Sequence, residues 1–224
     1  MLQKSVSLII IAKIIHFGRR TMNFPDYITH IPSVNNDFEN LSSDVFIIRG
    51  KRRNYVYDVG NGGDALEILS EIPNKIAIIS HFHHDHIMNI DKLGFEDVIQ
   101  GRITEKYTKV GRVIEDEMFI SDGVNIRVFF LTNSHAKDFL VLEVGDYLFL
   151  SDSVYCTVVK DERVYNANLL KKQIEELEKV SAKYFVVSHD EKLIYKKDEI
   201  INRLKSIYSR RNPKSAYIPE KAGD

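Results

Sequence analysis

The sequence predicts an α/β fold in which short buried strands alternate with amphipathic helices. The main observation is the order of the patterns: apolar runs typical of strands are followed by a helical pattern, and this order occurs twice along the chain. The second observation is size and composition. With 224 residues, 44% of them hydrophobic and 28% charged, the chain can bury a substantial core and resembles an ordinary globular protein.

The first half of the chain predicts a hairpin, a helix and a further strand. Residues 45–48 and 55–57 are β-branched and aromatic, flank a basic turn and predict the hairpin. A glycine-rich turn then precedes a helix that Asp64 is expected to cap and that ends before Pro73. Residues 75–79 form an apolar run, which predicts a buried strand.

The second half predicts more strands and two longer helices. Residues 91–125 are polar, with glycines that mark turns between short strands. Gly145 and Asp146 predict a hairpin turn. Beyond the polar section, the expected strands are 126–131, 139–144 and 147–150, and the expected helices are 168–180 and 198–208.

These patterns divide the chain into three parts. Residues 1–21 are interpreted as an N-terminal extension, 22–209 as one domain and 210–224 as a flexible C-terminal tail. The extension contains an apolar stretch, residues 7–15, that is shorter than the ~20 residues a membrane span needs. Lys13 interrupts this stretch and no small-residue cleavage site follows, so we expect a cytoplasmic protein, with export left open.

Charge and cysteine content narrow the range of partners. The formal net charge is −1, with acidic and basic residues well mixed, which does not suggest general affinity for nucleic acid or an anionic membrane. The single cysteine, Cys156, excludes an internal disulfide framework and is expected to pack as a small apolar residue. The expected partner is a small-molecule substrate, and the oligomeric state stays open.

Four of the six residues from 81 to 86 are histidines, and they follow the predicted strand at 75–79 directly. Alternate side chains of an extended segment share a face, so His81 and His83 are expected to point the same way and His84 away from them. Asp85 and His86 lie beyond the strand. Imidazole and carboxylate side chains in this pattern suit two neighbouring metal ions better than a chance polar loop.

The segment His81-x-His83-x-Asp85-His86 matches the H-x-H-x-D-H signature of the metallo-β-lactamase superfamily, which the chain resembles over about residues 44–189. The resemblance implies a four-layer αββα sandwich of two mixed sheets with helices outside. It also implies that Asp58 lies beside the site and orients a ligand histidine. By the family pattern, the first metal is held by His81, His83 and His135, the second by Asp85, His86 and His189, and both by Asp152.

The resemblance further implies two zinc ions per chain, with iron or manganese as alternatives. Two ions a few ångströms apart deprotonate a bridging water near neutral pH, and Asp85 and Asp152 are the expected catalytic carboxylates. The implied activity is hydrolysis of a small ester, thioester, lactone, amide or phosphoester. Two positions depart from the common pattern, Asn89 for a glycine and residues 136–138 for a T-P-G-S-like turn, and both reshape the expected pocket rim.

Two other functions stay open at this point. One is a mononuclear-iron oxidoreductase of the same fold, although such relatives usually lack part of the second site. The other is a non-catalytic metal-binding interaction protein, because the fold hosts many functions. Tyr155 and Lys137, close in sequence to Asp152 and His135, either contact substrate or have no role.

Overall fold

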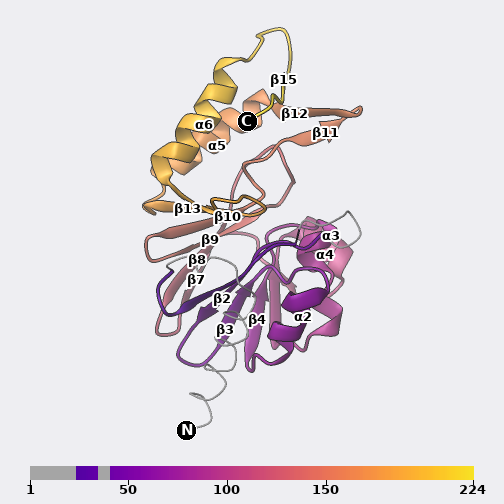
Figure 1. The fold of residues 1–224 in the computed structure, drawn as a ribbon, viewed down its shortest axis with the longest axis vertical. Coiled ribbons are helices and arrows are strands. Elements are labelled where there is room, and N and C mark those ends of the chain that lie inside the picture. Colours follow the sequence, from indigo (N-terminus) through magenta and orange to yellow (C-terminus); the bar gives the residue numbers. More distant parts are fainter. Residues whose placement is uncertain (1–23, 35–40) are drawn as a thin grey trace.

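The computed structural model describes residues 24–34 and 41–224, so the expected extension, residues 1–21, lies outside the described residues. Two six-stranded sheets pack face to face, with helices on both outer sides (Figure 1). The predicted αββα sandwich of two mixed sheets is therefore confirmed. Within the described residues, no helix is both long and apolar enough to cross a membrane.

The first sheet combines antiparallel and parallel pairs. The predicted hairpin is present, with Phe46 opposite Tyr57. The four strands from residue 54 to residue 113 run parallel, so their carboxyl ends meet at one edge of the sheet. The histidine-rich segment begins at this edge. In spatial order the strands are β1 (Ile28–Ile31), β2 (Val45–Arg49), β3 (Asn54–Tyr57), β4 (Lys75–Ile78), β5 (Asp97–Gln100) and β6 (Arg112–Val113).

The second sheet is antiparallel except for one pair. β10 and β13 run parallel, with Leu148 opposite Phe185, so the residues that follow these two strands emerge side by side. The predicted hairpin turn at Gly145 joins β9 and β10. In spatial order the strands are β14 (Ile194–Lys196), β13 (Tyr184–Val187), β10 (Tyr147–Ser151), β9 (Leu140–Val144), β8 (Asn125–Phe130) and β7 (Met118–Ser121).

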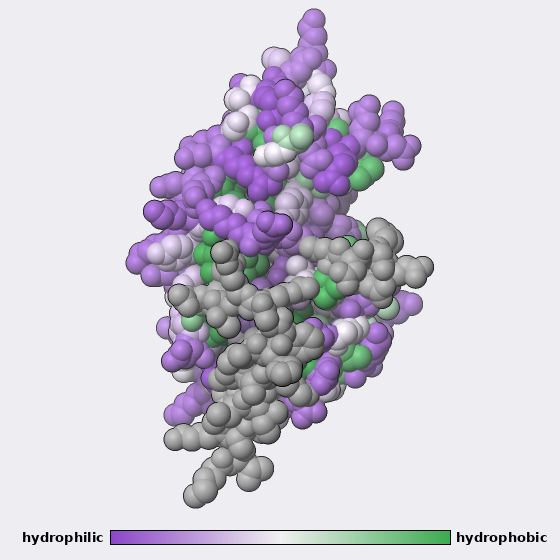
Figure 2. All heavy atoms as spheres, in the orientation of Figure 1, coloured by the Kyte–Doolittle hydropathy of each residue, from purple (hydrophilic) through white to green (hydrophobic). Residues whose placement is uncertain are grey.

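Helices cover the outer face of each sheet. α2 (Gly63–Ser70) buries Leu69 against the first sheet, and α5 (Ala167–Lys179) and α6 (Lys197–Ser209) cover the second. α5 turns Leu170 and Leu177 inward and its charges outward. The surface over α5 and α6 is accordingly mainly hydrophilic in the upper part of Figure 2.

Several helical details differ from the sequence prediction. The Asp64 side chain does not cap α2, because the helix begins at Gly63 and Gly62 holds the cap position. The section at 91–125 contains, besides strands, a 3₁₀ turn, η1 (Ile90–Lys92), and a short helix, α4 (Arg102–Thr108). α4 escapes a pattern search because only two of its residues, Thr104 and Thr108, are buried, and neither is apolar.

The two sheets share an apolar core that also contains hydrogen bonds between layers. Phe46 and Phe149, from opposite sheets, have ring centroids 4.7 Å apart. The hydroxyl of Tyr57 in β3 donates to the backbone oxygen of Leu140 in β9, at 2.8 Å. These contacts hold the ligand-bearing edges of the two sheets in a fixed relation.

A third, small sheet lies beyond α5. It consists of β11 (Thr157–Val159), β12 (Glu162–Asn166) and β15 (Tyr217–Pro219). β15 lies within residues 210–224, which the sequence predicts to be a flexible tail, and it pairs with β12 and buries Ile218. A three-residue strand with one buried side chain is too short to give a periodic pattern, which explains the difference.

Candidate metal centre

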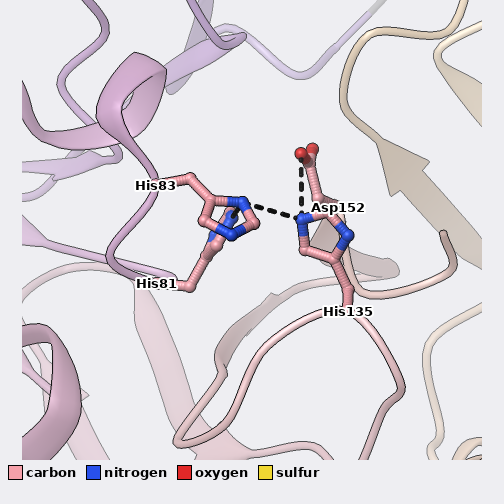
Figure 3. Close-up of side chains that lie close together, drawn as sticks. All are labelled: His81, His83, His135 and Asp152. Atoms are coloured by element: carbon pink, nitrogen blue, oxygen red, sulfur yellow. Dashed lines mark hydrogen bonds and ion pairs between the residues drawn. The ribbon is translucent and has the colours of Figure 1, made fainter. Parts of the chain in front are cut away.

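The first group of candidate ligands comes from three loops at one edge of the sandwich. His81 and His83 follow β4, His135 follows β8, and Asp152 comes directly after β10. One ligand atom from each lies within 4.8 Å of the others. The Nδ1 atom of His83 is 2.9 Å from Nε2 of His81 and 3.0 Å from Nε2 of His135, so three imidazole nitrogens converge (Figure 3).

The second group lies beside the first and shares Asp152 with it. Asp85 and His86 come from the short helix α3 (His84–Ile87), and His189 follows β13. Together with Asp152 they also place one ligand atom each within 4.8 Å of the others. Nε2 of His189 is 2.9 Å from Oδ2 of Asp85, and Nε2 of His86 is 3.4 Å from Oδ2 of Asp152.

Hydrogen bonds on the far side of two rings determine which nitrogen faces the centre. A carboxylate or carbonyl oxygen only accepts, so Nδ1 of His86 donates to Asp58 at 2.8 Å. In the same way, Nδ1 of His135 donates to the carbonyl of Cys156 at 3.1 Å. In the neutral rings, both Nε2 atoms therefore present a lone pair to the centre, as a metal ligand requires.

Asp58 anchors more of the site than one histidine. Its carboxylate also accepts from the backbone N–H of Ser80 at 2.8 Å and from the hydroxyls of Ser80 and Ser151 at 2.9 and 3.0 Å. The Ser80 hydroxyl, which donates to Asp58, is left to accept from Nδ1 of His81 at 2.9 Å. Asp58 thus orients His86 directly and His81 through Ser80. The hydroxyls of Ser80 and Ser151 complete this network, and no sequence motif indicates their role.

Burial and neighbouring charges set the protonation of the donors. Burial, together with the neighbouring histidines, lowers the pKa of His81 well below its usual value and that of His83 to about 4. Burial also lowers the pKa of His86, but the charges of Asp152 and Asp58 outweigh it and raise that pKa well above the usual value. Despite burial, hydrogen bonds and the charges of His86 and His189 lower the pKa of Asp85, which is ionised at neutral pH.

The donor atoms fit metal ions better than they fit one another. Within the described part of the chain, Nε2 of His86 and Oδ1 of Asp152 are buried and have no hydrogen-bond partner. Such groups are rare because leaving one unpaired costs about 1–3 kcal/mol. A cation at each group would satisfy these atoms, and nitrogen and oxygen donors suit zinc, iron or manganese.

The remaining polar residues near the centre are exposed or have other partners. His84 is exposed at the start of α3, and Lys137 is exposed as well. The Tyr155 hydroxyl donates to the carbonyl of Ser188 at 2.6 Å. Cys156 is buried in the core of the second sheet, as expected, and burial raises its thiol pKa to about 11.

Sequence reasoning missed Asp44, which precedes β2 and lies behind the second group. Burial acts to raise its pKa, but His30 and backbone N–H groups, including that of His189, hold it at about 2. Asp44 is therefore an ionised buried acceptor at neutral pH. No local signal could have revealed this role, because His189 is 145 residues away in the sequence.

Comparison with known proteins agrees with this geometry. Residues 39–146 match the model of the metallo-β-lactamase superfamily, whereas the search of curated proteins finds no match. A metallo-β-lactamase from Pontibacter korlensis is 15% identical, with 86% of this chain and 99% of that chain aligned at a TM-score of 0.64. The chain therefore resembles the metallo-β-lactamase superfamily in sequence over residues 39–146 and in fold.

Two further solved structures show the same fold. An archaeal metallo-β-lactamase superfamily protein from Sulfolobus tokodaii is 18% identical, covering 82% of this chain and 87% of that one, at a TM-score of 0.54. A flavoprotein from Thermotoga maritima is also 18% identical, at a TM-score of 0.59. The alignment with the flavoprotein covers 76% of this chain but only 53% of the flavoprotein. At these identities the likeness is one of fold.

Proposed function

We propose that this protein is a hydrolase with two zinc ions. The observation that carries the proposal is Asp152, whose carboxylate belongs to two adjacent, complete groups of donors. A carboxylate shared in this way suits two ions that act together. In this proposal His81, His83 and His135 would hold the first ion, Asp85, His86 and His189 would hold the second, and Asp152 would contribute to both.

The chemistry follows from the charge and placement of these side chains. Bound ions supply a water that is deprotonated near neutral pH and an electrophile for a carbonyl or phosphoryl oxygen. Asp85 and Asp152 are ionised, and we assign them the catalytic role of accepting hydrogen bonds from the attacking water. Asp58 keeps the rings of His81 and His86 in place through fixed hydrogen bonds.

The proposed substrate is a small molecule with an ester, thioester, lactone, amide or phosphoester bond. The mixed surface charge, with a net value of −1, favours no nucleic-acid partner. The one cysteine accords with a reducing compartment, and the cytoplasm is the location we propose. The hydrolytic domain would comprise residues 22–209.

The second candidate function is an iron-dependent oxidoreductase. The observation that favours it is the fold shared with the Thermotoga maritima flavoprotein and with flavo di-iron proteins from the same organism. The nitrogen and oxygen donors of both groups suit iron as well as zinc. Metal identity therefore separates the two candidates.

The first test is elemental analysis of the purified protein for zinc, iron and manganese, followed by a substrate screen with the zinc-loaded protein. The screen would include thioesters, lactones, phosphodiesters and β-lactams. About two zinc ions per chain and turnover that Asp152→Ala abolishes would support the hydrolase. Iron without turnover would favour the oxidoreductase. A protein that retains no metal after exposure to zinc would leave only a non-catalytic interaction role.

A further inference from the structure

Asp44 is the centre of a buried hydrogen-bond cluster behind the second group of ligands. Its side chain is 4% exposed and accepts four hydrogen bonds. Oδ1 accepts from Nε2 of His30 at 2.6 Å and from the backbone N–H of Ser33 at 3.0 Å. Oδ2 accepts from the Ser188 hydroxyl at 3.0 Å and from the backbone N–H of His189 at 2.9 Å. With these donors in place, Asp44 is a fully occupied acceptor and not itself a metal ligand.

The bonds from Oδ2 hold the turn that aims His189. The backbone of His189 has a φ of +59°, a left-handed conformation that is uncommon for a residue other than glycine. Such a conformation costs of order 1–3 kcal/mol and persists only where the surroundings enforce it. Here the enforcing contacts are those of Asp44, and the Ser188 hydroxyl additionally accepts from the Asp44 backbone N–H at 3.0 Å. The result is a His189 ring directed at Asp85, 2.9 Å away.

The neighbouring residue, Ser43, holds Asp85, the ligand at which the His189 ring is directed. Its backbone N–H donates to the carbonyl oxygen of Asp85 at 3.0 Å. Residues 43 and 44 thus bind the backbones of both Asp85 and His189, which reach the second group from opposite sheets. The ligands particular to the first group have different supports, because Ser80 holds His81 and the Cys156 carbonyl holds His135.

We propose that Asp44 is a positioning residue for the second metal ion, with His30 as the group that holds the Asp44 carboxylate. The inference rests on the proposed two-ion centre. It assigns Asp44 a selective effect: loss of its carboxylate weakens the second ion and leaves the first in place. His30 supports Asp44 by its short hydrogen bond and by stacking on Phe46, with ring centroids 4.9 Å apart.

The test compares Asp44→Asn with the matched control Asp122→Asn. Asparagine keeps the size of the side chain but turns an N–H₂ group toward one pair of donors. Asp122 is also a 4% exposed carboxylate that accepts from two backbone N–H groups, those of Arg52 and Arg53, and from the Tyr55 hydroxyl. Asp122 lies in the turn between β7 and β8 and contacts the turn before β3, at the end of β3 opposite to Asp58, so it controls for the loss of a buried charge.

Zinc stoichiometry and stepwise affinity would be measured by competition with a chromophoric chelator, and folding by circular dichroism. The wild type and Asp122→Asn are expected to bind two ions. Asp44→Asn is expected to bind the first normally and the second about 10- to 100-fold more weakly. His30→Phe, which keeps the stacked ring and removes the donor, should show the same selective loss to a smaller degree. If Asp44→Asn does not fold, the His30→Phe variant tests the inference in its place.

Three results overturn the inference: a folded variant that keeps the wild-type affinity for both ions, a folded variant that loses both equally, or a wild type that binds only one ion. Failure of the proposed function looks different. A wild type that binds two ions and hydrolyses nothing, beside an Asp44→Asn variant that loses the second ion, supports the inference and contradicts the hydrolase.

Discussion

The Asp58 carboxylate lies 2.8 Å from Nδ1 of His86, and both side chains are almost completely buried. A charged group is buried only where it is paired, and here the pair also fixes the orientation of a candidate ligand. The same carboxylate reaches His81 through the Ser80 hydroxyl. One residue outside the two groups of ligands therefore controls a ring in each of them.

Replacing Asp58 should weaken metal binding without removing a ligand. Asp58→Asn places an N–H₂ group where Nδ1 of His86 and two hydroxyls now donate, so the rings lose their fixed orientation. We expect zinc affinity to fall about 10- to 100-fold at both sites, measured by chelator competition. Asp64→Asn, on the surface helix α2, is the control and should bind zinc as the wild type does. Unchanged affinity in Asp58→Asn would show that the pair is only structural.

Asp152, which both groups of ligands share, and His84, which belongs to neither, give opposite predictions. Asp152→Ala removes a donor from both groups and should lose most bound metal and all hydrolytic activity. His84→Ala removes an exposed side chain next to the ligands and should keep both. The measurement is metal content per chain together with turnover of a substrate found in the screen. Equal losses in the two variants would contradict the assignment of ligands.

Zinc should stabilise the folded protein. The two groups of donors exist only in the folded chain, so an ion that binds there shifts the equilibrium toward it. At a free zinc concentration 100-fold above Kd, the gain is about 2.7 kcal/mol for one site. For a chain of this size we expect Tm to rise by about 5–10 °C. Differential scanning calorimetry checks this, with magnesium as the control because it prefers oxygen ligands. A Tm that zinc leaves unchanged would argue against both sites.

Tyr57 should contribute to stability through a hydrogen bond between the two sheets. Tyr57→Phe removes the hydroxyl that donates to the Leu140 carbonyl and leaves that buried oxygen with one partner fewer. The expected loss in the free energy of unfolding is about 1 kcal/mol, measured by urea denaturation. Tyr184→Phe, at a partly exposed position, should change it much less. Similar losses in both variants would mean that the bond between the sheets adds nothing.

The thiol of Cys156 should be unreactive in the folded protein. Burial and the hydrogen bond to Glu220 raise its pKa to about 11, and only the thiolate is a good nucleophile. At pH 8 the folded-state thiol is therefore almost entirely protonated as well as 5% exposed. We expect slow reaction with a thiol-specific dye in buffer and rapid reaction in denaturant. Rapid labelling of the native protein would place Cys156 at the surface.

Local patterns were sufficient for the main elements of the fold. The hairpin of β2 and β3, the strand before the histidines and the two long helices all have a clear apolar period, because one face of each packs against a core. α4 and β15 were missed or misjudged because they bury few apolar residues. A pattern search detects an element through its buried face, so elements without such a face escape it.

The sequence by itself determined which residues are candidate ligands, because the spacing in the histidine-rich segment is a local feature. The family resemblance that this spacing carries implied the remaining ligands and their division into two groups that share Asp152. Only the tertiary structure decided which residues outside the two groups hold the ligands in place. The support of His189 by Asp44 joins positions 145 residues apart. Such a contact depends on two sheets packing face to face, and this packing is a property of the whole core that no short stretch of sequence encodes.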